Sequence, residues 1–206
     1  MYDRQTRSLW SQVQGRAIAG SLEGSQLEKI PAWQTAWAEW RALHPETLVM
    51  VKPPIESSVY AGYSANAGRI GLFFSRPRDR RLPPKELVYG LQHGSAALAV
   101  PLALLDAQEV VHAELADRPL VVISRRTASA VRAFDCTVDG RALTFEALNE
   151  GGFRLKDTET GSIWDPASGT ALSGPLAGQA LTPVAGTLAY WDFWSRHHPG
   201  VKLVSP

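Results

Sequence analysis

The strongest constraint on this chain is a stretch that it contains twice. Residues 3 to 49 and residues 157 to 203 align without a gap at a constant offset of 154 positions. Fourteen residues are identical between the two stretches: Asp3/Asp157, Thr6/Thr160, Ser8/Ser162, Trp10/Trp164, Gly15/Gly169, Ala17/Ala171, Gly20/Gly174, Leu22/Leu176, Gly24/Gly178, Leu27/Leu181, Trp37/Trp191, Trp40/Trp194, His44/His198 and Pro45/Pro199. Self-similarity at a fixed offset predicts one structural unit used twice, so we expect equivalent folds.

Each stretch opens on the pattern Asp-x-x-Thr-x-Ser-x-Trp. In the second copy, residues 153–156 and 162–164 flank a turn in which Asp157 accepts backbone N–H groups and Gly161 takes the left-handed position. The first copy has Arg7 in place of Gly161, and only Met1 and Tyr2 stand where a whole strand should precede the turn. This missing strand predicts an exposed edge between residues 1 and 11, covered by homodimerisation or by another segment.

The repeated glycines alternate with small apolar residues. Their spacing favours short strands meeting at tight turns over a phosphate-binding loop, which would need a GxxxxGK[ST] or GxGxxG pattern opening a helix. Farther along, Trp37, Trp40 and His44 recur at i, i+3 and i+7, which predicts one face of a short helix from Thr35 to Leu43. The second copy repeats this face.

Residues 50–86 have no second copy and form the predicted connection. They contain a candidate strand at 70–74 and a basic run that includes Arg80 and Arg81. This run is interpreted either as a solvated surface or as an anion-binding loop, since arginine can hold carboxylate or phosphate bidentately.

From residue 87 onward short strands predominate, with a helical turn at 102–105. The Asp139-Gly140 pair is the strongest hairpin signal, and alternation places Cys136 on an apolar face with Phe134 and Val138 as a core thiol. Strands are expected at 88–91, 96–100, 110–115, 119–124, 131–138 and 141–148.

The predicted architecture is therefore β-rich α+β, a pseudo-symmetric tandem repeat with short strands, hairpins and one short helix per repeat. We expect residues 1–206 to form a single compact domain. It comprises half-repeat 1 (residues 1–49), the connection (50–86) and full repeat 2 (87–206), whose closing half, 157–203, matches 3–49.

The composition excludes several classes of function. With 21 basic and 20 acidic residues there is no global attraction to nucleic acid or to a membrane surface. A single cysteine rules out an internal disulfide. The sequence lacks both an 18-residue apolar run and a signal-peptide core, so we expect a cytoplasmic protein as the chain is written.

The motifs DRQT-x-S-LWSQ, G-x-AIAG-x-x-x-G-x-x-L and W-x-x-W-x-x-x-HPET closely resemble the domain of unknown function 3179 family of bacteria and archaea. The resemblance covers nearly the whole chain, and longer members of the family look like two tandem copies of one unit. It implies an upstream half-unit with WHEIVND and TYCPLCG stretches, so this chain looks like an N-terminally shortened member of one and a half units.

The second unit contains the region that corresponds to those stretches. There the His of the family pattern falls on Gln108, its Glu on Glu109, its Asn on His112, and its two Cys among residues 124–128. A thiol pair beside His and Glu could bind a soft metal or do redox work, but the pair is absent here. No metal site is predicted, and the sequence identifies no cofactor.

Two groups of residues are candidates for chemistry. One is the repeated box, Asp157, Thr160 and Ser162 with Asp3, Thr6 and Ser8, which is either a capped turn or a site where carboxylate and hydroxyls converge beside the Trp10 or Trp164 wall. The other is the histidine pair, His44 and His198, which either packs in the core or acts as acid and base. Neither serine lies in a GxSxG elbow.

These observations support two hypotheses. The first is a module that binds a small molecule or a protein partner between its half-repeats, with Trp10, Trp164, Arg80 and Arg81 as ligand-binding candidates. The alternative is a hydrolase of a small ester, lactone or sugar derivative, with or without the assistance of a metal, in which the box and its histidine line one cavity.

Overall fold

A computed structural model of the chain describes residues 1–33, 35–52, 62–63, 66, 78–125, 130–149 and 152–205. Within these residues the chain is β-rich, with several small sheets and few helices, as the sequence predicts. No helix among them is long and apolar enough to cross a membrane. The strand predicted at 70–74 lies outside the described residues, as do residues 126–128 of the region matched to the family's cysteines.

Two four-stranded sheets form the body of the molecule. The central sheet has the order β15-β8-β7-β6 and consists of β6 (Val110–Leu115), β7 (Arg118–Arg125), β8 (Ala130–Asp135) and β15 (Thr182–Val184). The helix-side sheet has the order β16-β4-β5-β17 and consists of β4 (Leu87–His93), β5 (Ala96–Pro101), β16 (Gly186–Tyr190) and β17 (Lys202–Leu203). Their described strand pairs are antiparallel except β17, which pairs parallel with β5.

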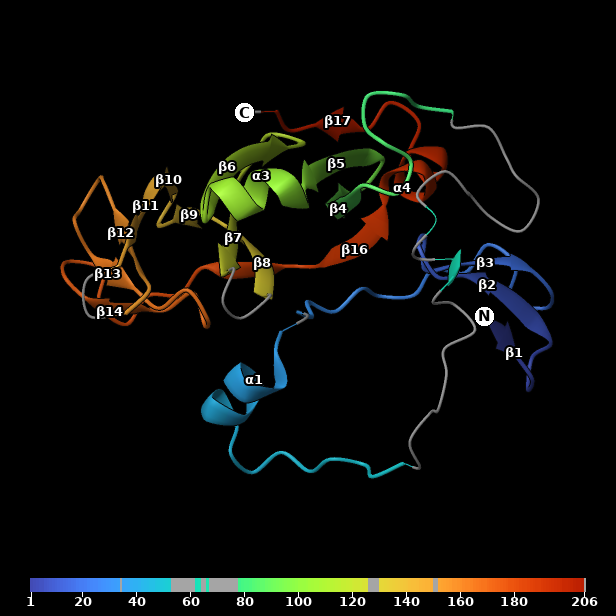
Figure 1. Cartoon of the computed structure of the whole chain (residues 1–206), viewed down its shortest axis with the longest axis horizontal. Helices are drawn as coiled ribbons and strands as arrows, with labels where there is room; N and C mark the ends of the chain where they lie inside the picture. Colours follow the sequence, from blue (N-terminus) through green and yellow to red (C-terminus); the bar gives the residue numbers. More distant parts are fainter. Residues whose placement is uncertain are drawn as a thin grey trace.

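Three smaller groups of strands complete the described β structure. The outer sheet consists of β11 (Phe145–Leu148), β12 (Arg154–Asp157), β13 (Ile163–Trp164) and β14 (Ala171–Ser173). The N-terminal sheet consists of β1 (Tyr2–Asp3), β2 (Ser8–Ser11) and β3 (Arg16–Ala19). A short hairpin joins β9 (Thr137–Val138) to β10 (Arg141–Ala142). The outer and N-terminal sheets lie at opposite ends of the molecule (Figure 1).

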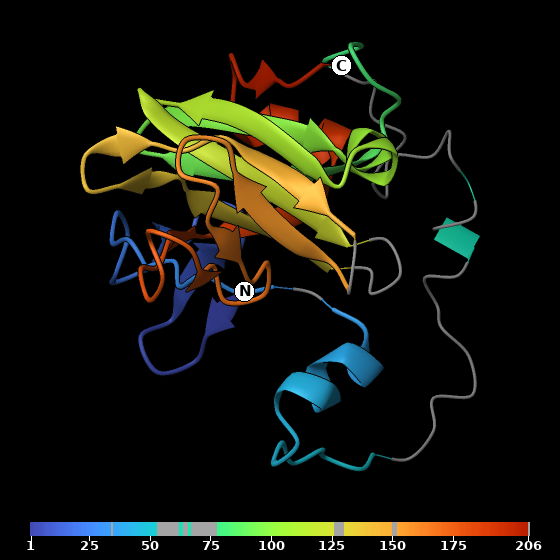
Figure 2. The same cartoon turned by 90° about the vertical axis from the view of Figure 1, so that its left-hand side faces the viewer.

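The inner strands β5 and β7 of the two main sheets are long apolar runs, and most of their residues are buried on both faces. Along β7, Leu120 and Val122 face the helix-side sheet and belong to the core between the two sheets, which also contains Leu104 and Leu105 of helix α3 (Leu102–Ala107). Val121 and Ile123 alternate onto the opposite face and pack in a second core against the outer sheet. The molecule is therefore layered, as Figure 2 shows from the side of the outer sheet.

The far face of the helix-side sheet is covered by helix α4 (Trp191–His197). Trp191 and Trp194 are fully buried there against Val88 and Ala99, and Val13 from the turn after β2 joins the same cluster. Trp194 lies directly over Gly90, where a Cβ atom would come within 2.4 Å of the indole ring. Glycine at position 90 thus allows the helix to approach the sheet this closely.

The predicted hairpin at Asp139-Gly140 is present, with φ values of 48° and 74°. The strands predicted on either side, 131–138 and 141–148, are wrong in extent because each divides between two sheets. β8 ends where the Asp135 carboxylate accepts the Thr137 backbone N–H at 2.9 Å. β10 then pairs with β9, whereas β11 pairs with β12. Cys136 is buried in the core beside the outer sheet, as expected.

The two similar stretches have matching backbone features at positions 154 apart. Trp10 pairs with Ala17 and Trp164 with Ala171, each next to a register shift, and the bridges Arg16–Gln26 and Thr170–Ala180 also correspond. Helix α1 (Trp37–Leu43) begins at the position equivalent to the start of α4, two residues after the predicted start. Arg7, the counterpart of Gly161, adopts a left-handed φ of 54°.

The two stretches differ between the hairpin and the helix. Residues 182–190 form β15 and β16, which pair with β8 and β4, but residues 28–33 contain no strand. The physical reason is the lack of a partner, because a strand forms only where a neighbour takes up its backbone hydrogen bonds. Helix α1 accordingly has no buried residue, Trp37 is 49% exposed, and α1 stands away from the sheets (Figures 1 and 2).

Strand β1 lies at the edge of the N-terminal sheet. Among the described strands β1 pairs only with β2, and it leaves Met1 and Tyr2 mostly exposed. The expected homodimer through this edge stays a prediction.

Candidate functional site

The box of the second copy is a closed hydrogen-bond network. Asp157 Oδ1 accepts the Thr160 backbone N–H at 2.6 Å, while Oδ2 accepts from Thr160 Oγ1 at 3.0 Å and from Trp164 Nε1 at 2.9 Å. The Thr160 and Ser162 hydroxyls share a hydrogen bond of 2.7 Å, and Ser162 Oγ accepts the Leu176 backbone N–H at 3.0 Å. Asp157 and Ser162 are fully buried. The structure brings these predicted residues together around a turn, with their polar atoms directed at one another.

The first stretch builds a similar network in a more exposed setting, without a counterpart of the Trp164–Asp157 hydrogen bond among its described contacts. Asp3 accepts from the Thr6 hydroxyl, the Thr6 and Ser8 hydroxyls share a hydrogen bond of 2.9 Å, and Ser8 Oγ accepts the Leu22 N–H at 3.1 Å. Trp10 is only half-buried, whereas Trp164 is fully buried and packs edge-on against Phe145. A sealed Trp164 presents no face to a ligand arriving from solvent.

Hydrogen bonding controls the ionisation of both carboxylates. Burial opposes ionisation of Asp157, but the donors Trp164 and Thr160 outweigh it and hold its pKa below the usual value. The Thr6 hydroxyl is the main cause of the lowered pKa of Asp3, helped by the backbone N–H of Gln5. Both carboxylates are therefore ionised acceptors at neutral pH, a role that suits turn closure.

The candidate histidines lie apart from the second box. His198 follows α4 and packs on Trp194 with ring centroids 4.1 Å apart, while β13 of the box lies in the outer sheet at the other end of the molecule (Figure 1). His44 repeats the contact with Trp40 at 4.2 Å but is exposed. His198 is 7% exposed, and its Nε2 is covered without a hydrogen-bond partner among the described residues. His198 is therefore a buried histidine packed against Trp194, which is the first of the two alternatives that the sequence offered.

The protein should lose stability as the pH falls from about 6.5 to about 4, with His198 as one cause. Burial, with smaller effects of Lys29 and His197, lowers the pKa of His198 to about 4. The unfolded chain takes up this proton near pH 6.5, the folded chain only near pH 4, so the stability present above the unfolded pKa is lost across that window. Urea unfolding midpoints of His198→Phe should change less over this range. His44→Phe is the control and should keep the original profile; equal slopes in all three proteins would contradict the assignment.

The ligand-binding candidates Arg80 and Arg81 differ in their surroundings. Arg80 is exposed. Arg81 pairs with Asp79 at 2.7 Å, donates to the Val201 carbonyl at 3.0 Å and lies 5.0 Å from the centre of the Trp191 ring. The hydrogen bond from Arg81 also lowers the pKa of Asp79. Arg81 therefore connects the segment before β4 to the start of α4 and to the segment that follows α4.

The site that sequence reasoning missed is Arg132 in the middle of β8. Its neighbours Val131 and Ala133 face the core between the sheets, so alternation places Arg132 on the opposite face with Phe134. The guanidinium is 9% exposed and lies 3.2 Å from the centre of the Trp33 ring. Nη1 donates to the Pro166 carbonyl at 3.0 Å, but Nε and Nη2 are covered and have no hydrogen-bond partner among the described residues. The sequence feature that could have revealed this site is an arginine within the mainly apolar strand AVRAFD.

Arg132 lines a cavity of about 350 Å³ between α1, the end of the central sheet and the outer sheet. Arg125 and Arg154 also line it, together with Glu39 and Asp165 and the apolar side chains of Ile123, Phe153 and Leu172. Glu39 Oε1 lies 3.5 Å from Arg125 and 3.8 Å from Arg132. Burial lowers the pKa of Arg132 to about 10 against the opposing effects of Glu39 and Asp165, so the group remains a cation at neutral pH.

The region matched to the family's histidine and cysteine pattern is structural in its described part. His112 stacks on Phe145, and its Nε2 accepts the Phe145 backbone N–H at 2.9 Å. Burial lowers the pKa of His112, which keeps this nitrogen an acceptor. No cluster of three or more metal-ligating side chains occurs within the part of the chain that the structure describes.

Comparison with protein families gives one result. The model of a family described as "Protein of unknown function (DUF3179)" matches residues 1–201. Neither the curated proteins nor the solved structures contain a match.

Proposed function

The chain belongs to the DUF3179 family of proteins of unknown function, and from its geometry we propose that it is a ligand-binding module whose arginine cavity holds the carboxylate of a small molecule with an apolar body. The carrying observation is the buried guanidinium of Arg132 beside that cavity, in which Nε and Nη2 have no hydrogen-bond partner among the described residues and Glu39 comes no closer to Nη2 than 3.8 Å. An unpaired buried donor is costly unless a partner satisfies it, and a carboxylate matches the guanidinium fork.

The shape and walls of the cavity support this class of ligand. A volume of about 350 Å³ lies within the range of small-molecule pockets. Arg125 and Arg132 approach it from neighbouring strands, at one end of an apolar wall that includes Phe153 and Leu172. An aromatic or branched aliphatic carboxylate would place its charge on the arginines and its body on this wall.

Helix α1 supports the proposal as a lid. Glu39 meets the two arginines only at ion-pair distances, while its other oxygen accepts from Thr35 Oγ1 at 2.7 Å. A seven-residue helix without buried side chains gains little stability from itself or from packing. Glu39 thus acts as an internal carboxylate that a ligand displaces, and α1 moves aside to admit it.

We also propose that the two similar stretches are copies of one ancestral unit. Equal strand registers, equal box hydrogen bonds and helices that begin at equivalent residues support this. In the second copy the helix rests on a sheet, whereas in the first it is free to serve as the lid of the arginine cavity.

The placement of the candidate residues does not favour the hydrolase alternative. The hydroxyls of Thr160 and Ser162 bond to each other and to the box, and His198 lies in a separate layer. No base is thereby offered to Ser162.

The test is calorimetric titration with benzoate, benzamide and benzylamine, which share one apolar body and differ in charge. Benzoate should bind best. Arg132→Met should weaken benzoate binding by about 10- to 100-fold, as expected for lost charged hydrogen bonds, while keeping the fold, because methionine fills a similar volume. Arg41→Met, which removes an exposed arginine from α1 itself, is the matched control and should bind normally.

A second variant tests whether α1 is a lid that the ligand displaces or a fixed wall of the arginine cavity. Glu39→Gln removes the competing charge, so benzoate should bind several-fold more tightly, by roughly 3- to 10-fold for a loosely held ion pair. Weaker binding by Glu39→Gln would show that Glu39 supports the ligand. Equal affinity for benzoate and benzylamine, or normal benzoate binding by Arg132→Met, would overturn the proposal.

A further inference from the structure

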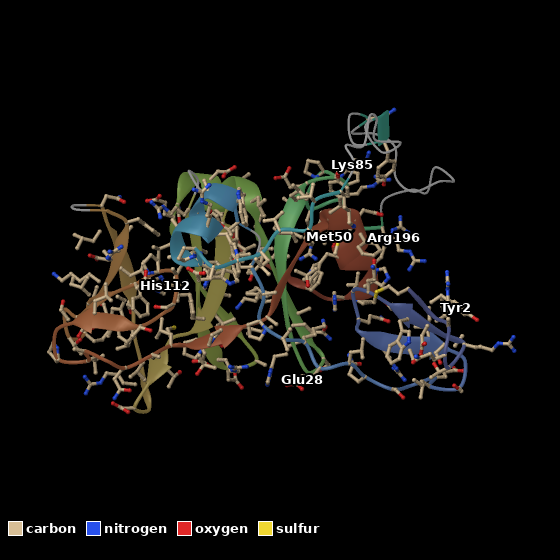
Figure 3. The ribbon with its side chains drawn as sticks, turned by 90° about the horizontal axis from the view of Figure 1, so that it is seen from below. Tyr2, Glu28, Met50, Lys85, His112 and Arg196 are labelled. Atoms are coloured by element: carbon tan, nitrogen blue, oxygen red, sulfur yellow. The ribbon has the colours of Figure 1, made fainter. Side chains whose placement is uncertain are left out.

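A second cavity, distinct from the arginine cavity, lies between α4 and the turn that follows β2. Its volume is about 580 Å³, and its walls come from that turn, from the segment entering β4, from β16 and from α4. Figure 3 shows Lys85 and Arg196, two of its lining residues, beside α4 and far from His112. The two cavities have no lining residue in common.

Asp192 is the unusual residue of this cavity. Its side chain lines the cavity although the residue is only 3% exposed. Oδ2 accepts from Arg196 Nε at 2.6 Å, but Oδ1 is covered and has no hydrogen-bond partner among the described residues. A buried carboxylate oxygen without a donor is costly and calls for a specific explanation.

The helix itself does not require this pair. The counterparts of Asp192 and Arg196 in α1 are Ala38 and Ala42, and α1 forms the same seven-residue helix with them. Packing of α4 on the sheet depends on Trp191 and Trp194, which occur in both copies of the sequence. The buried ion pair is thus an addition to the second helix, placed at the cavity.

The charges and apolar surfaces around Asp192 define the ligand. Lys85 and Arg196 bring positive charge to the same cavity, so an ammonium ligand is disfavoured, and Asp192 disfavours a carboxylate. Phe193 and Leu87 add large apolar surfaces that are 46% and 42% exposed. A neutral compound with neighbouring hydroxyls fits best, because hydroxyls both donate to Asp192 and accept from the cationic groups.

We infer that this cavity is a binding site for a neutral hydroxylated ligand of monosaccharide size. One hydroxyl donates to Asp192 Oδ1, another accepts from Lys85 or Arg196, and the C–H face of the sugar packs on Phe193. The volume is ample for one such ring and its ordered waters.

The experiment uses D-glucose, D-galactose and myo-inositol as probes, detected by saturation-transfer NMR and quantified by titration of the whole chain. At least one probe should bind saturably. The double variant Asp192→Ala/Arg196→Ala gives α4 the alanines that α1 has at the equivalent positions, so it should stay folded. It should bind the same probe at least about tenfold more weakly. Phe193→Ala should weaken binding of the sugar probe while leaving the ion pair between Asp192 and Arg196 in place.

Two controls separate this inference from the proposed function. Arg132→Met should bind the sugar probe normally, and the double variant should bind benzoate normally, so each site can fail without the other. Failure of all three probes to saturate, equal binding by the double variant, or preferential binding of benzylamine in this cavity would overturn the inference.

Discussion

Trp164→Ala is expected to destabilise the protein by about 3–5 kcal/mol, because a large fully buried side chain is lost from the core beside the outer sheet. The substitution also removes the indole N–H that donates to Asp157 Oδ2 at 2.9 Å, which leaves a buried carboxylate with fewer donors. For a chain of 206 residues this corresponds to a fall in Tm of about 6–20 °C. Thermal and urea unfolding followed by circular dichroism measure both quantities.

The chain contains its own control for this experiment. Trp10 occupies the equivalent position of the same turn and strand register, but it is only half-buried and its described contacts include no counterpart of the Trp164–Asp157 hydrogen bond. Trp10→Ala should therefore cost well under half as much. Equal losses for the two variants would mean that the box, rather than burial, determines what tryptophan contributes at this position.

Gly90→Ala is expected to destabilise the protein strongly although it adds only one methyl group. The new Cβ would lie 2.4 Å from the Trp194 ring, and Trp194 is 1% exposed, so neither partner can move without shifting α4 or β4. Overpacking of this kind typically costs about 1–3 kcal/mol and occasionally more. The expected result is a fall in the urea midpoint or a failure to accumulate folded protein.

A double-mutant cycle identifies the cause. Trp194→Leu makes room for the methyl group, so Gly90→Ala should cost less in that background, with a coupling energy of about 1 kcal/mol or more. Gly62→Ala is the matched control, since nothing lies within 4 Å of its Cβ position. If Gly90→Ala cost the same with and without Trp194, backbone strain would be the explanation in place of the indole contact.

Elements formed by local interactions were predictable. The turn at Asp139-Gly140, the box turn closed by Gly161 and the helices at the two tryptophan pairs depend on residues within a few positions of one another. Cys136 was placed in the core because alternation along a strand is a local property. The capped-turn interpretation of the box likewise depends on local contacts, because its hydrogen bonds join residues a few positions apart.

Features that depend on distant partners were not predictable. The strand predicted from 131 to 138 divides at Cys136 because its two parts pair with different strands. Nothing near residues 28–33 in sequence shows that they lack the strands found at 182–190, since those strands exist only through β8 and β4. Arg132 was overlooked because its neighbours predict only a buried strand, while Trp33, Glu39 and Asp165 reach it from far along the chain.

The sequence by itself determined the turns, the hydrogen-bonded boxes and the two tryptophan-bearing helices, because each is completed by residues close together along the chain. The tertiary structure alone decided that one copy is buried and the other exposed, and that Arg132 and Asp192 border cavities. The physical reason is that burial and the pairing of charges depend on which surfaces meet, and those surfaces come from segments far apart along the chain.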